Sequence, residues 1–445
     1  MNICFVANHR KTIFFHKISQ ELEKKGIVVY WITVNKKNFN FLNKKYKKEK
    51  ILYISKNIKK NNIVGEFKLN EIVANDRALK YNIKEGLLFL ENIQKPVLNF
   101  LIKNNIKKIF GENTWAHEIL IKRIAESENI NYLLPHTIRI PYNRFGFFKD
   151  EYYSILLERK KHEEDYKNVD FLKKPDYLML NDKKIKKNKT IFSNFKKIFR
   201  FLFDYYYDKF DPNYSGFYNK IKEKFAEKRN RLFYKYIKKT YIGEEFLKTN
   251  KYIFFGLHKQ PEASIDVIGR YYEDQYKLIY NLWRILPSNY FLLIKDHTNA
   301  IGDRSYSFYK KIKTLPKVIL LNEKMDSHLI VQYSQLVATV SGTIGFEAIL
   351  RDKRAITFGP VFFSKYTNCL QIGLDDLKKY TLKDIIDKID RIPNDIEKLK
   401  KYLICNSFEG IISDPDADER CIENKNIKFI VNSILYVCNN CESKY

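Results

Sequence analysis

The sequence lacks any apolar stretch near the roughly 18 residues that a membrane-spanning helix needs, although apolar residues make up 45% of its 445 residues. It is also short of acidic residues, because 52 Asp and Glu stand against 81 Lys and Arg and leave a formal net charge of +29. A field of that size favours polyanions or anionic membrane surfaces as partners. Glycine and proline are few while Lys, Asn, Ile, Tyr and Phe are abundant. Part of the charge therefore reflects a compositional bias, and charge alone identifies no partner.

Cysteine is scarce as well, with six residues that are scattered apart from the pair Cys438 and Cys441. A single CxxC pair is weak evidence for a zinc or redox site, so we expect ordinary thiols in a reducing compartment. Residues 1–8 form a short apolar run without a basic leader or a small-residue cleavage site. This run predicts a strand and no signal peptide. We therefore expect a cytoplasmic protein, or one bound peripherally at the inner face of the cytoplasmic membrane.

Strand and helix patterns alternate over the first 150 residues and again over residues 251–375. Alternation of this kind predicts an α/β fold in which two parallel, doubly wound sheets are covered by helices on both faces. Ligands are then expected outside the carboxyl ends of the strands. The expected strands are 2–7, 28–34, 51–54, 107–110 and 132–134 in the first half, and 252–255, 291–294, 318–321, 336–340 and 355–358 in the second.

The segment between the two halves has a different composition. Residues 151–250 are dense in Lys, Arg, Tyr and Phe, as at 195–203 and 231–236, and apolar residues recur there at steps of three and four. This spacing predicts amphipathic helices with a basic face. Such helices either lie on an anionic membrane surface or pack an aromatic stripe on the core as a domain linker. Residues 376–445 are expected to be a basic helical tail that packs back across the two halves.

The most informative segment runs from residue 335 to 358. An apolar run ends at the small turn residues Ser341, Gly342 and Thr343, and a short helix and a second apolar run follow. A strand that restarts as a helix after such a turn presents backbone N–H groups and hydroxyls, which form an anion site. Glu347 lies one turn inside this helix, where its carboxylate can accept hydrogen bonds from ribose hydroxyls. The segment therefore predicts a nucleotide-sugar site.

Polar residues follow two other strands of the same half. His258, Gln260 and Glu262 come after the strand at 252–255, and Lys295 and His297 come after the strand at 291–294. Because the carboxyl ends of parallel strands meet at one edge of a sheet, these residues and the turn at 341–343 predict one composite phosphate and sugar site.

The N-terminal half offers a second group of polar residues after strands. Glu112 and His136 are the candidate general acid or base, and Arg139 and Arg144 are candidates to bind a carboxylate with two hydrogen bonds. The structural alternative is that Glu112 caps the following helix and that His136 satisfies a buried carbonyl.

Taken together, these motifs resemble the bacterial capsule polysaccharide synthesis family, which includes the retaining β-Kdo transferases. The resemblance is clear over residues 251–375 and weaker over 107–150. It implies a metal-independent GT-B glycosyltransferase with two Rossmann-like domains facing a cleft, no bound cofactor, and a CMP-activated acidic sugar as donor. The residues and the resemblance together predict Glu112, His136, Glu262 and His297 for catalysis, His258, Gln260, Pro261, Lys295, Ser341, Gly342, Thr343 and Glu347 for the donor, and Arg139 and Arg144 for the sugar carboxylate.

Two positions depart from the family pattern. The His-Pro motif falls on His297 and Thr298, so its proline is lost, and the aspartate nucleophile of the retaining enzymes is replaced by Ser264. Serine is a poor substitute for a carboxylate that attacks an anomeric carbon, so Glu262 is the candidate for a covalent step and the stereochemical outcome stays open.

The resulting prediction is a transferase that moves Kdo or a related nonulosonic acid from a CMP donor to a glycan or lipid-linked acceptor. The alternatives are a UDP-sugar epimerase of similar build, a nucleic-acid-binding protein suggested by the charge alone, and a non-catalytic scaffold of the same assembly pathway. The sequence contains no recognisable nucleic-acid-binding motif, so no nucleic-acid partner is expected.

Overall fold

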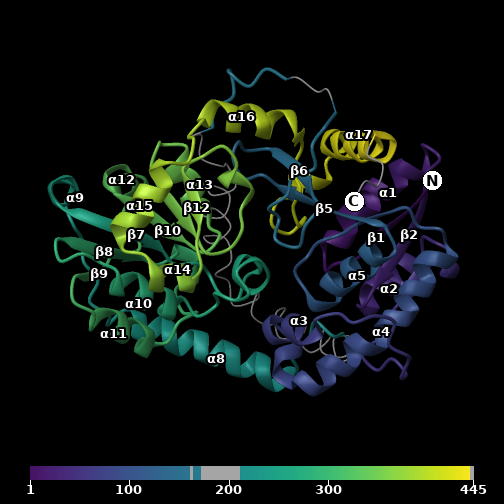
Figure 1. Ribbon diagram of the computed structural model, residues 1–445. Helices are drawn as coiled ribbons and strands as arrows, with labels where there is room; N and C mark the ends of the chain where they lie inside the picture. Colours follow the sequence, from purple (N-terminus) through teal and green to yellow (C-terminus); the bar gives the residue numbers. More distant parts are fainter. Residues whose placement is uncertain (161–163, 172–210, 441–445) are drawn as a thin grey trace, which may run out of the picture. The chain divides into compact units, whose positions relative to one another are not determined.

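The computed structural model describes residues 1–160, 164–171 and 211–440 (Figure 1). Its contacts group the chain into two compact units. The N-terminal unit comprises Met1–Lys149, Leu156–Asn219 and Ile404–Tyr445, and the C-terminal unit comprises Asp150–Ile155 and Lys220–Leu403. This division differs from the expected boundaries at 150, 250 and 375, because the last helix joins the first unit and residues 220–250 join the second.

Each unit is a doubly wound α/β structure, so the predicted fold class with two Rossmann-like domains is confirmed. The strands of the N-terminal sheet lie in the order β13-β6-β5-β4-β1-β2-β3, in which β1 to β5 are parallel and β6 and β13 are antiparallel additions. The five strands expected from the sequence are present. Their bounds are β1 Asn2–Val6, β2 Val28–Thr33, β3 Ile51–Tyr53, β4 Lys108–Phe110, β5 Asn131–Thr137, β6 Arg144–Phe148 and β13 Phe408–Glu409.

The central strands are apolar on both faces because helices cover both sides of a parallel sheet. Ile3, Cys4, Phe5 and Val6 of β1 are all fully buried. Helix α17 packs against α1, while α3, α4 and α5 contact one another (Figure 1). The helices of this unit are α1 Lys11–Glu23, α2 Lys36–Asn43, α3 Leu69–Asn75, α4 Ile83–Lys103, α5 Ala116–Ser127 and α17 Asn424–Asn440.

The C-terminal sheet is entirely parallel, with the strand order β12-β11-β10-β7-β8-β9. Its strands are β7 Lys251–Gly256, β8 Tyr290–Lys295, β9 Val318–Leu320, β10 Leu336–Thr339, β11 Ala355–Thr357 and β12 Cys369–Gln371. Helix α9 Glu244–Thr249 precedes β7. The helices after the strands are α10 Gln275–Arg284, α11 Tyr306–Lys313, α12 Ser327–Tyr333, α13 Thr343–Ile349, α14 Leu374–Lys379 and α15 Leu382–Asp390, with α8 Phe217–Tyr234 and α16 Ile396–Cys405 at the unit boundaries.

Part of the predicted basic and aromatic insertion lies outside the described residues, including the run at 195–203, and so does Cys441 of the CxxC pair. The run at 231–236 forms the end of α8 and the turn after it. Within the described ranges, no helix combines the length and the apolar character needed to cross a bilayer.

Helix α17 completes the core of the N-terminal unit although it comes last in the chain. Ile430, Ile434 and Val437 are buried in the same cluster as Phe14 and Ile18 of α1. The apolar side of α17 therefore covers α1 and the sheet edge near β13. The core beside β1 therefore includes a helix that begins at Asn424, near the end of the sequence.

Replacing Ile434 by Ala should lower the free energy of unfolding of the N-terminal unit by about 2–5 kcal/mol, because it leaves a cavity in a close-packed core. Urea unfolding followed by Trp31 and Trp115 fluorescence in a Trp283→Phe background isolates this unit. The control Ile102→Ala, at a side chain that is 56% exposed, should change the value by less than about 0.5 kcal/mol. Equal effects of the two substitutions would show that α17 does not belong to this core.

Candidate functional site

Both sheets have a point at which the chain reverses the direction in which it adds strands. In the N-terminal sheet, β2 and β3 lie on one side of β1, and the chain then returns to place β4 on the other side. Ligands of doubly wound folds bind outside the carboxyl ends of the strands at such a switch point. Asn8 and Lys11 follow β1 and Glu112 follows β4, so all three lie at the N-terminal switch point.

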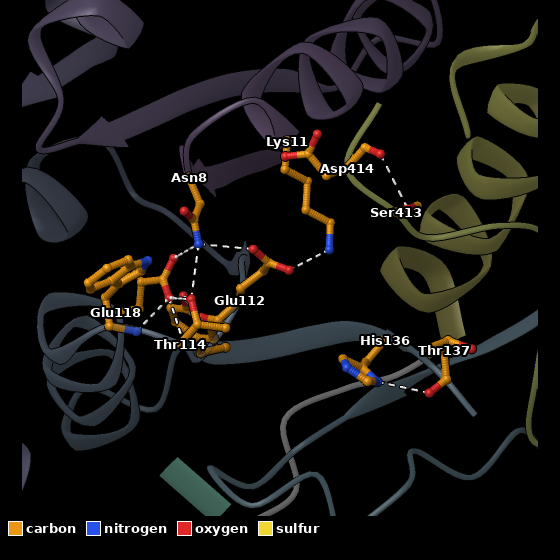
Figure 2. A network of polar contacts seen from close by, with 11 residues as sticks. Asn8, Lys11, Glu112, Thr114, Glu118, His136, Thr137, Ser413 and Asp414 are labelled. Carbon is orange, nitrogen blue, oxygen red and sulfur yellow. Dashed lines mark hydrogen bonds and ion pairs between the residues drawn. The ribbon is translucent and has the colours of Figure 1, made fainter. Parts of the chain in front are cut away.

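Glu112 is held between two donors from the segment after β1 (Figure 2). Nδ2 of Asn8 donates to its Oε2 at 2.9 Å, and Nζ of Lys11 donates to its Oε1 at 2.5 Å. Burial by itself would raise the pKa of Glu112, but the charge and hydrogen bond of Lys11 outweigh burial and lower it. Glu112 is therefore an ionised carboxylate at neutral pH.

A second carboxylate, Glu118, lies on the other side of Asn8. Its side chain is fully buried and accepts from the backbone N–H groups of Thr114 and Trp115 at 2.7 and 3.1 Å and from Nδ2 of Asn8 at 2.8 Å. Burial, followed by the charge of Glu112, raises the pKa of Glu118 to about 7. Two carboxylates that share one amide thus have pKa values pushed in opposite directions, an arrangement that separates acid and base roles in enzymes. The sequence suggested that Glu112 could cap the following helix, but in the structure Glu118 caps helix α5.

His136 lies on β5, next to β4 in the sheet. Its Nδ1 lies 2.8 Å from the carbonyl oxygen of Thr137, and because a carbonyl can only accept, Nδ1 carries the hydrogen. Burial, together with the charges of Arg139 and Lys11, lowers the pKa of His136 to about 3. His136 is therefore neutral, with its lone pair on Nε2.

The two predicted carboxylate-binding arginines differ. Arg139 is exposed in a backbone conformation with φ of 67°. Arg144 is 7% exposed and donates to both carboxylate oxygens of Glu164 at 2.6 and 2.8 Å and to Oγ of Ser407 at 2.8 Å. The guanidinium of Arg144 already binds the carboxylate of Glu164 in the same unit, so the predicted binding of a sugar carboxylate at Arg144 is not supported.

In the C-terminal sheet the switch point lies between β7 and β10, and His258 joins these strands there. Its Nε2 accepts from the backbone N–H groups of Val340 and Ser341 at 3.2 and 3.4 Å. Nε2 therefore carries no hydrogen, and the hydroxyl of Thr339 donates to it at 2.8 Å. The N–H of Gly342 in turn donates to the Thr339 oxygen at 3.2 Å.

This arrangement corrects one expectation about the turn. Three of its backbone N–H groups, those of Val340, Ser341 and Gly342, point inward to His258 and Thr339 and not outward to a ligand. Glycine is required at 342, because a Cβ there would lie 2.7 Å from Oγ1 of Thr339 and 2.9 Å from Cε1 of His258. His258 thus shapes the predicted donor turn from within.

Residues that the sequence did not identify hold the loop after β7. Gln275 accepts from the N–H of His258 at 2.8 Å and donates to Oε1 of Gln260 at 3.2 Å. The peptide between Gln260 and Pro261 is cis. Arg304 donates to the carbonyl of His258 and to the buried carboxylate of Asp296. The strand-end position of Asp296 in the sequence was the available signal for this network.

The predicted catalytic residues after β7 and β8, Glu262 and His297, interact electrostatically. Nδ1 of His297 accepts from the N–H of Asn299 at 3.1 Å, so its hydrogen lies on Nε2. Burial lowers the pKa of His297, and the negative charge of Glu262 is the largest of the effects that raise it. Oγ of Ser264 donates to Glu262 at 3.0 Å, and the carbonyl of Ser264 accepts from Oγ of Ser341 at 2.9 Å. The ends of β7, β8 and β10 therefore converge on one place.

Glu347 of α13 pairs with Nδ1 of His328 at 3.2 Å. Burial lowers the pKa of Lys295, and the negative charge of Glu347 is among those that raise it. Nζ of Lys295 donates to Oγ of Ser327 at 2.6 Å. Thr343, the first residue of α13, is half-buried. A hollow of about 360 Å³ lies beside this group and is lined by Asp326, His328, Leu329, Gln332, Arg351 and Lys353.

Within the part of the chain that the structure describes, no group of three or more His, Cys, Asp or Glu side chains could hold a metal ion. Metal independence and the absence of a cofactor stay predictions.

The profile of the family described as "Capsule polysaccharide biosynthesis protein" matches residues 170–379. This match contains the segment 251–375 that carries the motifs, so the resemblance to that family is confirmed. It does not extend to residues 107–150, and no curated protein matches the chain.

Solved structures that match the chain include two transferases and an epimerase. The β-Kdo 2,7 transferase KpsC of Thermosulfurimonas dismutans is 11% identical, with 98% of this chain and 100% of that chain covered and a TM-score of 0.38. The β-Kdo 2,4 transferase of the same KpsC is 13% identical over 77% and 95%, with a TM-score of 0.34. The UDP-GlcNAc 2-epimerase of Neisseria meningitidis, bound to UDP-GlcNAc, is 13% identical over 98% and 100%, with a TM-score of 0.30.

The carboxylate pair gives a pH-dependent prediction. The pKa of Glu118 is raised from 4.5 to about 7 in the fold, so the folded protein holds the proton of Glu118 more tightly than the unfolded chain does. This contribution to stability is fully present below pH 4.5 and is lost as the pH rises to 7. The Glu118→Gln variant keeps the acceptor for the Thr114 and Trp115 N–H groups without the ionisation. Between pH 4.5 and 7.5, the unfolding free energy of the wild type should fall relative to Glu118→Gln by on the order of 3 kcal/mol. A difference that does not change with pH would contradict the assignment.

Proposed function

We propose that this chain is a glycosyltransferase of surface polysaccharide biosynthesis that transfers Kdo or a related nonulosonic acid from a CMP-sugar to a glycan acceptor. One observation carries the proposal: Lys295 and His297 follow β8, Ser341 and Glu347 follow β10, and these two strands lie on either side of β7 at the switch point of one parallel sheet. Cations, hydroxyls and a carboxylate in this arrangement match the phosphate and ribose of a nucleotide sugar. The family match to capsule polysaccharide biosynthesis supports the pathway.

The donor phosphate would lie against Lys295, His297 and Thr343. When the bond between the anomeric carbon and the phosphate oxygen breaks, the bonding electrons leave with CMP and negative charge grows on its phosphate. The ammonium of Lys295 and the Nε2–H of His297 stabilise that charge in a half-buried site, where electrostatic interactions are stronger than in water. Glu347 would accept the ribose hydroxyls, and the hollow beside His328 gives room for the nucleoside.

Glu112 would remove the proton of the acceptor hydroxyl. Its carboxylate is already ionised, and Asn8 and Lys11 hold it in one orientation. The neutral His136, with its lone pair on Nε2, is the second candidate for this role. Arg139 is the candidate for the sugar carboxylate, because the guanidinium of Arg144 is held by Glu164.

Glu262 would serve as the nucleophile if the reaction passes through a covalent intermediate. Ser264 occupies the position of the family's aspartate, and its hydroxyl donates to Glu262. Glu262 is exposed on the loop after β7, so its carboxylate can approach a bound sugar. In this proposal the enzyme needs no metal and acts from the cytoplasm.

Replacing His297 by Ala should lower turnover of CMP-Kdo by about a hundredfold, because one hydrogen bond to the leaving phosphate is lost. Thermal unfolding should change little, since among the described residues the ring of His297 makes one hydrogen bond, from the N–H of Asn299. Asn299→Ala, in the same turn, is the matched control and should keep full turnover. Unchanged turnover of His297→Ala would remove His297 from the site.

Replacing Glu112 by Gln should lower kcat by about 10²- to 10⁴-fold, as expected when a general base is lost, with a smaller change in KM for the donor. Product analysis by mass spectrometry with and without acceptor distinguishes the reaction classes. Sugar transferred to the acceptor supports the transferase, whereas free sugar released from UDP-GlcNAc without acceptor would identify an epimerase. Absence of both products with folded protein would identify a scaffold.

A further inference from the structure

Helix α8 has one face whose contacts are fixed by the C-terminal unit. Asn230 and Tyr234 are 7% and 4% exposed. Nδ2 of Asn230 donates to the carbonyl of Gly302 at 3.2 Å, and the hydroxyl of Tyr234 donates to Glu323 at 3.0 Å. The ring of Tyr234 also contacts the ring of Tyr309 at 5.3 Å between centroids. These contacts determine which side of the helix points away from the unit.

The opposite side carries large apolar side chains in contact with solvent. Phe225 and Leu232 are seven residues apart and therefore lie on the same side of the helix. They are 69% and 59% exposed, and Tyr236 in the turn after the helix is 81% exposed. Single exposed apolar residues are ordinary, but several on one helix face mark an interaction surface. We call this set, with the cations described next, the outer face of α8.

Cations surround these apolar side chains. Lys222, Lys228, Arg229 and Lys235 are all exposed, and Arg229 lies between Phe225 and Leu232 on the same side. From residue 222 to 236 the sequence has six Lys and Arg against two Glu. One of the two, Glu227, pairs with Arg231 at 2.8 Å, and its backbone lies beside Gly302 on the inner side. The outer face is therefore both apolar and positively charged.

We propose that the outer face of α8 binds the surface of an anionic lipid bilayer. Aromatic and leucine side chains enter the boundary between headgroups and acyl chains, while the flanking lysines and Arg229 contact lipid phosphates. A leucine on the same line as the aromatic rings suits acyl chains, since it offers no stacking surface to a nucleic-acid base. The inference goes beyond the proposed function and does not depend on it. It also selects one of the two interpretations of the basic, aromatic segment for its described part.

Cosedimentation of the full chain with lipid vesicles tests the proposal. Vesicles of phosphatidylcholine containing about one third phosphatidylglycerol should bind the protein, and vesicles of phosphatidylcholine alone should bind it at least about tenfold more weakly. The Phe225→Ser/Leu232→Ser variant should bind the anionic vesicles at least about tenfold more weakly than the wild type. Ile63→Ser, which removes a side chain that is 62% exposed elsewhere, should bind like the wild type.

Charge reversal provides the second arm. Lys228→Glu/Arg229→Glu should abolish most binding to the anionic vesicles, whereas Lys378→Glu/Lys383→Glu, with the same change in net charge, should retain it. Binding to anionic vesicles that is equal for the wild type and both α8 variants would overturn the proposal. So would α8 variants that lose single-stranded DNA binding or self-association while their vesicle binding stays unchanged. Transfer to a soluble acceptor, measured on the same variants, should be unaffected, so a failed transferase proposal remains distinguishable.

Discussion

The organisation of the C-terminal unit depends on one hydrogen-bonded histidine. Nε2 of His258, at the end of β7, accepts from the Thr339 hydroxyl and from two backbone N–H groups beyond β10. These bonds join the two strands at the point where the sheet reverses direction, and they leave Gly342 no room for a side chain. The turn that opens α13 is therefore set by a residue that precedes it by some eighty positions. Because a buried donor or acceptor without a partner is costly, the turn has little freedom to adopt another shape.

In the N-terminal unit, buried hydrogen bonds at the switch point likewise fix the positions of two carboxylates. The side-chain amide of Asn8 donates to both Glu112 and Glu118, and the ion pair with Lys11 keeps Glu112 ionised. A charged Glu112 and a Glu118 whose pKa lies near 7 follow from burial and one ion pair, without any ligand. Each sheet thus has buried polar contacts at its switch point, those of Glu112 and Glu118 in one sheet and those of His258 in the other. This is the distribution expected when a fold gives up stability locally for chemistry.

The strands were predictable because a parallel strand buried on both faces is a continuous apolar run, as at Ile3–Val6. The strand-end positions of Glu112, His258 and His297 were predictable for the related reason that a polar group directly after such a run must lie at the sheet edge. The hydrogen-bond partners that lie far away in the sequence could not be predicted. Nothing local to Arg144 indicates that Glu164 and Ser407 occupy its guanidinium, and nothing local to Ser341 indicates that its N–H turns to His258. Helix α17 was expected to be helical, but its place in the N-terminal core is a long-range packing outcome.

A calorimetric titration of CMP, UDP and GDP into the wild type and the Thr339→Val variant tests most directly whether the turn shaped by His258 is a cytidine-nucleotide site. Valine keeps the shape of threonine and removes the hydroxyl that joins His258 to Gly342. We expect the wild type to bind CMP in preference to UDP and GDP, and Thr339→Val to bind CMP about tenfold more weakly, as expected for the loss of one buried hydrogen bond. Equal CMP affinity of the two proteins, or a wild type that prefers UDP, would contradict the assignment.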